Sequence, residues 1–186
     1  MKTVIEEWGT LHILINNVGG GGRWGSDNIE KTTEQVWMEV YNKNALATIR
    51  FTMRTMPFMR KQKWGRVVTV TSIYGIEGGG RPWFNMAKTA QTAFMKNLAM
   101  RSELVQDGIT FNSVAPGAIM IPDTGWDAEQ KKCPEVFEKM VQEKFPLGRM
   151  GTPEEVANVI VFICSTSASL LNGASIPVDG GESRRF

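Results

Sequence analysis

Residues 11–19 read LHILINNVG, and this stretch decides the fold class. A run of apolar, mostly branched side chains ends at a polar turn with a glycine, which is typical of a short strand buried in a parallel sheet. Three further segments share this pattern, at residues 66–71, 109–115 and 174–178. Longer segments of helical periodicity separate them. The alternation predicts βα units and therefore an α/β fold with a parallel sheet.

The segments between the strands predict the connections. We expect helices over residues 32–64 and 82–106, a short helix ending at residue 145, and another over residues 153–165. Thr32 and Gln35 should form a capping box, and Pro57 should kink or shorten the end of the first helix. Residues 116–134 are expected to form a mobile loop. Right-handed crossovers would place the strands side by side in chain order.

The composition points to a small-molecule partner. A chain of 186 residues, 42% of them hydrophobic, supports one domain over residues 1–186. The net charge of +2, without a long basic run, argues against nucleic acid and anionic membranes. Two cysteines without CxxC spacing and one histidine argue against zinc and fit a reducing cytoplasm. No apolar run approaches the roughly 20 residues that span a bilayer. We expect a cytoplasmic protein.

A glycine-rich run follows the first strand. Gly20, Gly22 and Gly25 match the GxGxxG spacing of a dinucleotide-binding turn. Such a turn must lead straight into a helix, whose N-terminus then binds the pyrophosphate. Here a polar loop follows instead, and the helix begins too late. We therefore interpret this run as a flexible loop at the rim of an active site.

Several motifs, in the right order, resemble the short-chain dehydrogenase/reductase family. The family's Asn-Asn-Ala-Gly signature reads NNVG at residues 16–19, and the C-terminal region carries PLGR at 146–149 and VDGG at 178–181. The resemblance covers residues 3–181 and corresponds to the C-terminal two-thirds of the family. It implies a partial Rossmann-like three-layer α/β sandwich with a parallel sheet, from which the N-terminal βαβ half is missing.

The resemblance also implies the site residues. The catalytic positions are Asn44, Ser72, Lys88 and Phe84, and the cofactor-binding positions are Asn17, Gly19, Lys88, Pro116 and Gly117. In the family mechanism the lysine lowers the pKa of a tyrosine, which donates its proton to a carbonyl oxygen held by the serine. Phe84 stands in place of that tyrosine and has no proton to donate. Loss of a general acid typically costs about 10²–10⁴ in rate.

The implied cofactor is NAD or NADP. The family's phosphate-binding turn and the residue that selects between the two nucleotides would lie upstream of Met1, and Ile121 replaces a threonine that contacts the carboxamide. We therefore expect a reductase-like chain that acts on a carbonyl or alcohol of unspecified identity only as part of a larger unit. Alone, it should neither bind the cofactor nor transfer a hydride.

Two other functions stay open. Ser72 with Lys88 as base would make a serine hydrolase, although no GxSxG motif surrounds Ser72. Alternatively, the chain is a non-catalytic subunit that binds another protein. Tyr74 is the nearest phenol to Ser72, but it cannot copy the geometry of a residue one helical turn before Lys88.

The chain is also expected to self-associate. Its first apolar strand lacks a neighbour on one side, which makes it a template for another chain. The helices over residues 32–64 and 82–106 carry Met53, Met56, Phe58, Phe94 and Met95, which suit an apolar contact face. We predict a twofold homodimer or a higher homo-oligomer.

Overall fold

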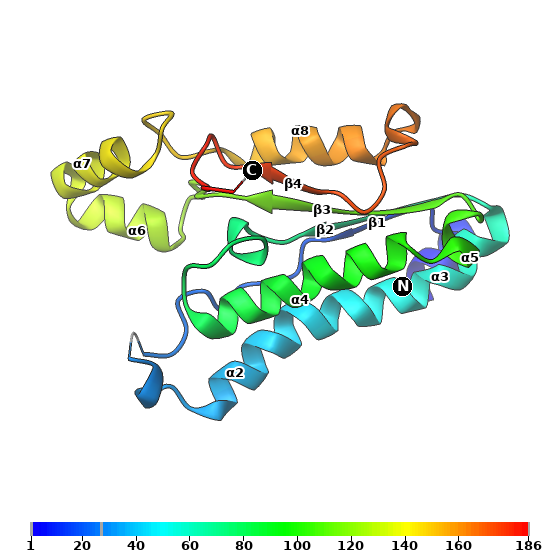
Figure 1. The fold of residues 1–186 in the computed structure, drawn as a ribbon, viewed down its shortest axis with the longest axis horizontal. Helices are drawn as coiled ribbons and strands as arrows, with labels where there is room; N and C mark the ends of the chain where they lie inside the picture. Colours follow the sequence, from blue (N-terminus) through cyan, green and yellow to red (C-terminus); the bar gives the residue numbers. More distant parts are fainter. Residues whose placement is uncertain (1, 27, 186) are drawn as a thin grey trace.

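A computed structural model, which describes residues 2–26 and 28–185, has three layers with a parallel sheet in the middle (Figure 1). The sheet order is β1-β2-β3-β4. Its strands are β1 (Ile13–Asn16), β2 (Gly65–Val70), β3 (Ile109–Pro116) and β4 (Ser175–Val178). Every neighbouring pair is parallel. The predicted α/β class and the arrangement of the strands in chain order are confirmed.

Helices cover both faces of the sheet. One face carries α2 (Glu34–Tyr41), α3 (Ala47–Gln62) and α4 (Pro82–Ala99), and the other carries α8 (Pro153–Cys164) (Figure 1). The remaining α-helices are α1 (Lys2–Trp8), α5 (Ser102–Val105), α6 (Gly125–Lys132) and α7 (Pro134–Lys144). A π-helical segment, η2 (Asn42–Leu46), joins α2 to α3, and single 3₁₀ turns are η1 (Ile29–Lys31), η3 (Ile73–Gly75) and η4 (Thr166–Ala168). Both α6 and α7 lie at the end of the sheet where β3 terminates (Figure 1).

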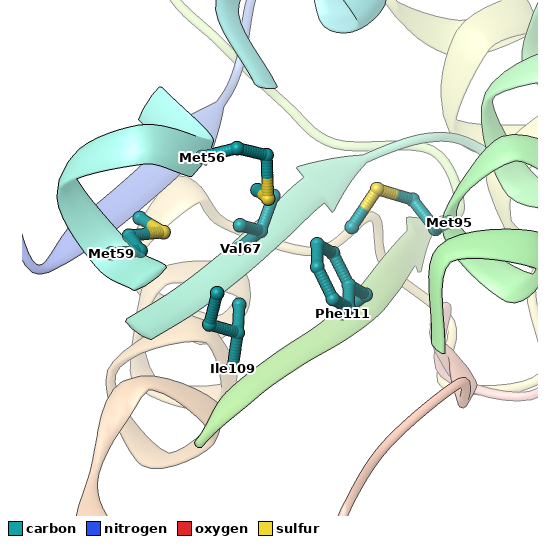
Figure 2. Packing of buried hydrophobic residues seen from close by; sticks show 6 residues of the cluster. All are labelled: Met56, Met59, Val67, Met95, Ile109 and Phe111. Atoms are coloured by element: carbon teal, nitrogen blue, oxygen red, sulfur yellow. The ribbon is translucent and has the colours of Figure 1, made fainter. Parts of the chain in front are cut away.

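Two apolar clusters hold the layers together. The cluster beneath α3 and α4 contains Met56, Met59, Val67, Met95, Ile109 and Phe111 (Figure 2). The second packs α8 against the other face of the sheet. We expected Met56 and Met95 on a contact face, but they are 7% and 0% exposed and belong to this core. Unbranched methionine fills the irregular gap between helices and sheet.

The first long helix differs from its prediction at its start. Its N-cap is Thr33 and no side chain caps it, so the predicted Thr32–Gln35 capping box is wrong. The Thr32 hydroxyl instead accepts a hydrogen bond from the Ser26 N–H, at 3.1 Å. Pro57 lies inside α3, which continues to Gln62, close to the predicted end of the helix. The described residues do contain a capping box, at Thr152 and Glu155 of α8.

Two other boundaries also differ. The helix expected over residues 82–106 breaks at Met100 and Arg101, which separate α4 from α5. The loop expected over residues 116–134 contains α6. No side chain of this helix is fully buried, although Trp126 packs against Phe137, so its sequence lacks the strong apolar periodicity that would have revealed it.

The first strand forms one edge of the described sheet. It pairs with β2 alone, and Ile13 and Ile15 on it are 43% and 46% exposed. His12, expected within the strand, lies directly before it and is exposed. The predicted open apolar edge is therefore present in the described residues.

Candidate functional site

The expected site residues gather where the parallel strands end. Asn17 and Gly19 follow β1, Ser72 follows β2, and Pro116 and Gly117 end β3. Open α/β sheets bind ligands at this edge. The helical candidates come from two further elements: Asn44 from the π-helical segment η2, and Phe84 and Lys88 from successive turns of α4.

Asn44 ties the segment after β1 to the helical layer. Its Nδ2 donates to the carbonyl oxygens of Gly20 and Val40, both at 2.8 Å, and its Oδ1 accepts from the Gly20 N–H at 3.2 Å. The side chain is fully buried, so these bonds satisfy groups that would otherwise be costly to bury. Single π-turns within helices often mark functional sites, and this one places Asn44.

Gly19 leaves the space in which two site residues meet. A Cβ at Gly19 would lie 2.7 Å from Asn44 Oδ1 and 3.0 Å from Lys88 Nζ. Side chains at this position would therefore displace the Asn44 amide or the Lys88 amine. The glycine of the NNVG motif is therefore required because Asn44 and Lys88 approach its Cα closely. It is not required by the backbone, since Gly19 does not have a positive φ.

Lys88 is a buried amine. It is 5% exposed, and its Nζ donates to the carbonyl oxygen of Val70 at 3.2 Å. Burial lowers its pKa to about 8, because desolvation disfavours the charged form. The amine also lies 5.6 Å from the centroid of the Phe84 ring. The nearest aromatic group to Lys88 on α4 therefore carries no hydroxyl.

Ser72 is half-buried and sits at the N-cap of η3. Its Oγ accepts a hydrogen bond from the Tyr74 N–H at 3.2 Å, which leaves the hydroxyl proton available to another acceptor. Among the described residues, Ser72 and Lys88 share no hydrogen bond. Burial, with Glu182 and Glu77 nearby, raises the pKa of the Tyr74 phenol, which makes it a poorer proton donor.

An apolar cavity of about 310 Å³ opens at the same edge. It is lined by Asn17, Val70, Pro116, Ile119 and Ile121, together with residues of α8. Val70 is one of the lining residues, and its carbonyl oxygen accepts the hydrogen bond from Lys88 Nζ. Most of the lining side chains are apolar, and Lys88 itself is not among them.

Sequence reasoning missed several residues here. Asn16, rather than the exposed Asn17, is buried, and its Nδ2 donates to Thr52 Oγ1 and Thr69 Oγ1 at 3.1 and 3.3 Å. Glu182 Oε2 accepts from the Ala118 N–H at 2.6 Å, directly after the Pro116-Gly117 pair. Burial raises the pKa of the Glu182 carboxyl above its usual value, and the hydrogen bond from Ala118 offsets this only in part. Glu182 is distant in sequence from the loop it contacts, so no local pattern could have revealed it.

The glycine-rich run does not form a phosphate-binding turn. The Gly20 N–H is bonded to Asn44 and the Trp24 N–H to the Gly21 carbonyl oxygen, and α2 begins only at Glu34. Residues 2–26 and 28–185 also contain no cluster of histidine, cysteine and acidic residues suited to a metal ion. Within the same residues, no helix is both long and apolar enough to cross a membrane.

Comparison with known proteins places this geometry in a family. A family model described as enoyl-(acyl carrier protein) reductase matches residues 1–183. The 3-oxoacyl-[acyl-carrier-protein] reductase of Thermotoga maritima is 34% identical over 182 residues, which cover 97% of this chain and 70% of that protein. Its counterpart in Aquifex aeolicus is 38% identical over 146 residues, covering 78% of this chain and 56% of the relative.

Solved structures agree. Levodione reductase superposes with a TM-score of 0.86 at 28% identity, over 100% of this chain and 71% of that one. A short-chain dehydrogenase/reductase from Burkholderia thailandensis superposes with a TM-score of 0.84 at 30% identity, over 97% of this chain and 67% of its own. The strand order, the site edge and these relatives lead to one conclusion: the chain belongs to the short-chain dehydrogenase/reductase family.

Proposed function

We propose that this chain carries the carbonyl-binding part of a reductase site, and that it cannot by itself complete the reduction. Ser72 would hold the carbonyl oxygen of a small substrate through its free hydroxyl proton. Lys88 would place a positive charge beside that oxygen. The observation that carries the proposal is the position of Phe84, one turn before Lys88 on the same helix.

A phenol at this position would share its environment with the Lys88 amine, which would favour the ionised phenol and so ease proton transfer. A phenyl ring cannot transfer a proton. The carbonyl oxygen would therefore gain negative charge without a general acid, which typically costs about 10²–10⁴ in rate.

Part of a nicotinamide cofactor fits the described residues. The cavity beside Asn17, Val70 and Pro116 suits the ring, and Lys88 has donor capacity beyond its bond to Val70. Nicotinamide, when bound, supplies the hydride that side chains cannot. The described glycine-rich run does not fit the phosphates, because Asn44 and the Gly21 carbonyl oxygen already engage its N–H groups. We infer that NAD or NADP is held only weakly by these residues.

We also propose that the protein works in the cytoplasm. Both cysteines are free, Cys133 exposed and Cys164 buried, which supports the expectation of a reducing cytoplasm. The partners would be a small carbonyl compound and a second copy of the chain.

A chimera tests the proposal. These residues would replace the matching 182-residue region of the Thermotoga maritima relative, so that the rest of that reductase is present. We expect slow reduction of a 3-oxoacyl substrate with Phe84, and a gain of about 10²-fold or more with Phe84→Tyr. Phe58→Tyr, at another partly buried aromatic position, serves as control. A chimera that reduces the substrate equally well with Phe84 and with tyrosine would overturn the proposal.

A further inference from the structure

The Lys88 side chain is buried without an acid to hold its charge. Among the described residues, the acceptor for its Nζ is the carbonyl oxygen of Val70, at 3.2 Å, and no carboxylate pairs with it. Burial is the cause that lowers its pKa to about 8. At pH 7.5 about a quarter of the folded molecules therefore carry Lys88 as the uncharged amine.

The lone pair of that uncharged amine is not engaged. An amine that donates an N–H to a carbonyl oxygen points its lone pair away from that oxygen, and Val70 takes the N–H. No donor in the part of the chain that the structure describes is bonded to Lys88 Nζ. The aromatic ring beside it, Phe84 at 5.6 Å, has no hydroxyl that could donate to the nitrogen. An electrophile is therefore the partner that this lone pair lacks.

The amine can be approached from the segment that follows β1. A Cβ at Gly19 would lie 3.0 Å from Lys88 Nζ, so the nitrogen borders the space that the missing side chain leaves. Gly19 itself is partly exposed, and Asn17 and Val18 before it are exposed. The same Cβ would lie 2.7 Å from Asn44 Oδ1, so the space is narrow and polar on its far side. Only a small molecule fits beside the amine.

A buried, partly uncharged lysine has the properties of an amine nucleophile. Desolvation in an apolar site is one of the ways in which proteins activate lysine towards carbonyl compounds. An ordinary exposed lysine, with a pKa near 10.4, is uncharged in only about 0.1% of molecules at pH 7.5. Lys88 carries the reactive form about 10²-fold more often than such a lysine.

We propose that Lys88 forms a reversible Schiff base with a small, uncharged ketone or aldehyde. The Nζ lone pair attacks the carbonyl carbon, and the carbonyl oxygen takes up one proton of the amine to give a carbinolamine. The hydroxyl then leaves with the second amine proton as water while the C=N bond forms. Amine and carbonyl thus give imine and water without oxidation or reduction. The inference rests on the proposed function only in taking a carbonyl compound as the ligand.

Reduction of the imine in place tests the inference without turnover. The purified chain is incubated at pH 7.5 with acetone and sodium cyanoborohydride, which converts an imine into a stable secondary amine. Digestion and mass spectrometry then locate each isopropyl group. We expect Lys88 to be labelled at least about tenfold faster than Lys96, an exposed lysine on the same helix. The factor is below 10² because Lys88 is only 5% exposed.

Two substitutions test whether the missing hydroxyl leaves the lone pair available. Phe84→Tyr supplies a phenol that can donate to Nζ or hold it as the ammonium, and should lower labelling of Lys88 about fivefold or more. Phe84→Leu removes the ring without adding a hydroxyl and should keep labelling within about twofold. In urea that unfolds the chain, Lys88 and Lys96 should be labelled at equal rates.

Three results would overturn the inference. They are labelling of Lys88 no faster than that of Lys96 in the folded chain, a preference for Lys88 that persists in urea, and undiminished labelling with Phe84→Tyr. The chimera with the Thermotoga maritima relative reports separately on the proposed function. Fast labelling of Lys88, combined with a chimera that gains nothing from Phe84→Tyr, would keep this inference and remove the proposed function.

Discussion

The Lys88 amine lies 5.6 Å from the centroid of the Phe84 ring, and among the described residues its one hydrogen-bond acceptor is the carbonyl oxygen of Val70. A phenyl ring offers a weak electrostatic contact in place of an anion. The cost of burying this charge is therefore largely uncompensated, which is the physical reason why the Lys88 pKa lies at about 8 rather than at 10.5.

The depressed pKa predicts a specific dependence of stability on pH. Between pH 8 and 10.5 the unfolded chain keeps the proton that folded Lys88 has lost, so the free energy of unfolding should rise with pH in this window. Below pH 8 the full penalty, about 3 kcal/mol, is present. Lys88→Met should therefore stabilise the protein at pH 7 and flatten the rise, as measured by urea unfolding at pH 7 and 10. Lys96→Met, on the same helix but exposed, is the control. Parallel pH profiles for Lys88→Met and the parent would contradict this account.

The hydrogen bonds already made by the Gly20 and Trp24 N–H groups of the glycine-rich run predict weak nucleotide binding. Because the Gly20 N–H bonds to Asn44 and no α-helix begins after this run until Glu34 among the described residues, the run offers no cradle for a pyrophosphate. We expect isothermal titration of the purified chain to show no saturable binding of NADH or NADPH below the millimolar range. A dissociation constant in the micromolar range for either nucleotide would show that another surface binds the phosphates.

The capping box of α8 predicts a measurable loss of stability. Thr152 Oγ1 accepts from the Glu155 N–H and Glu155 Oε2 accepts from the Thr152 N–H, at 3.4 and 2.9 Å. Thr152→Ala should lower the free energy of unfolding by about 1 kcal/mol. Thr33→Ala is a matched control, since Thr33 is the N-cap of α2 but makes no capping bond. Denaturant unfolding of both variants checks the difference, and equal losses would mean that the box contributes nothing.

The lack of a hydrogen bond between Ser72 and Lys88 in the described residues predicts no hydrolase activity through this pair. A nucleophilic serine needs a base within hydrogen-bond reach, yet Ser72 bonds to the Tyr74 N–H and Lys88 to Val70. Ser72→Ala should leave any hydrolysis of p-nitrophenyl acetate unchanged within about twofold, as should Ser165→Ala. Loss of most of the activity in both Ser72→Ala and Lys88→Ala would restore the hydrolase alternative.

Exposed apolar side chains on α3 predict a homodimer. Phe51 and Met53 are 41% and 55% exposed, and they are better candidates for the contact than Met56 and Met95, which are buried. Light scattering after size exclusion should give a dimer at tens of micromolar. Phe51→Ser with Met53→Ser should shift it towards the monomer, whereas Phe162→Ser, on α8, should not. A stable 20.7 kDa species for the unmodified chain would contradict the prediction.

The local sequence by itself determined the strands, because each strand is encoded by one continuous run of residues. Short apolar runs ending in polar turns specified four strands, because a strand buried on both faces needs apolar side chains on both. The positions of Ser72, Pro116 and Gly117 at strand ends followed directly. Local sequence did not determine the start of the first helix. Thr32 and Gln35 have the spacing of a capping box, but the Thr32 hydroxyl accepts a hydrogen bond from the Ser26 N–H instead.

Tertiary structure alone decided how distant residues meet. Nothing local in the sequence shows that Gly19 must lack a side chain because Asn44 and Lys88 occupy its space, nor that a helical lysine is buried without an acid. Arg23 and Glu129 are 106 positions apart, and their ion pair exists only because β1 and β3 end at the same edge of the sheet. Periodicity reports which face of an element is apolar. It carries no information about which polar side chains from separate elements converge, and the chemistry of this site depends on that convergence.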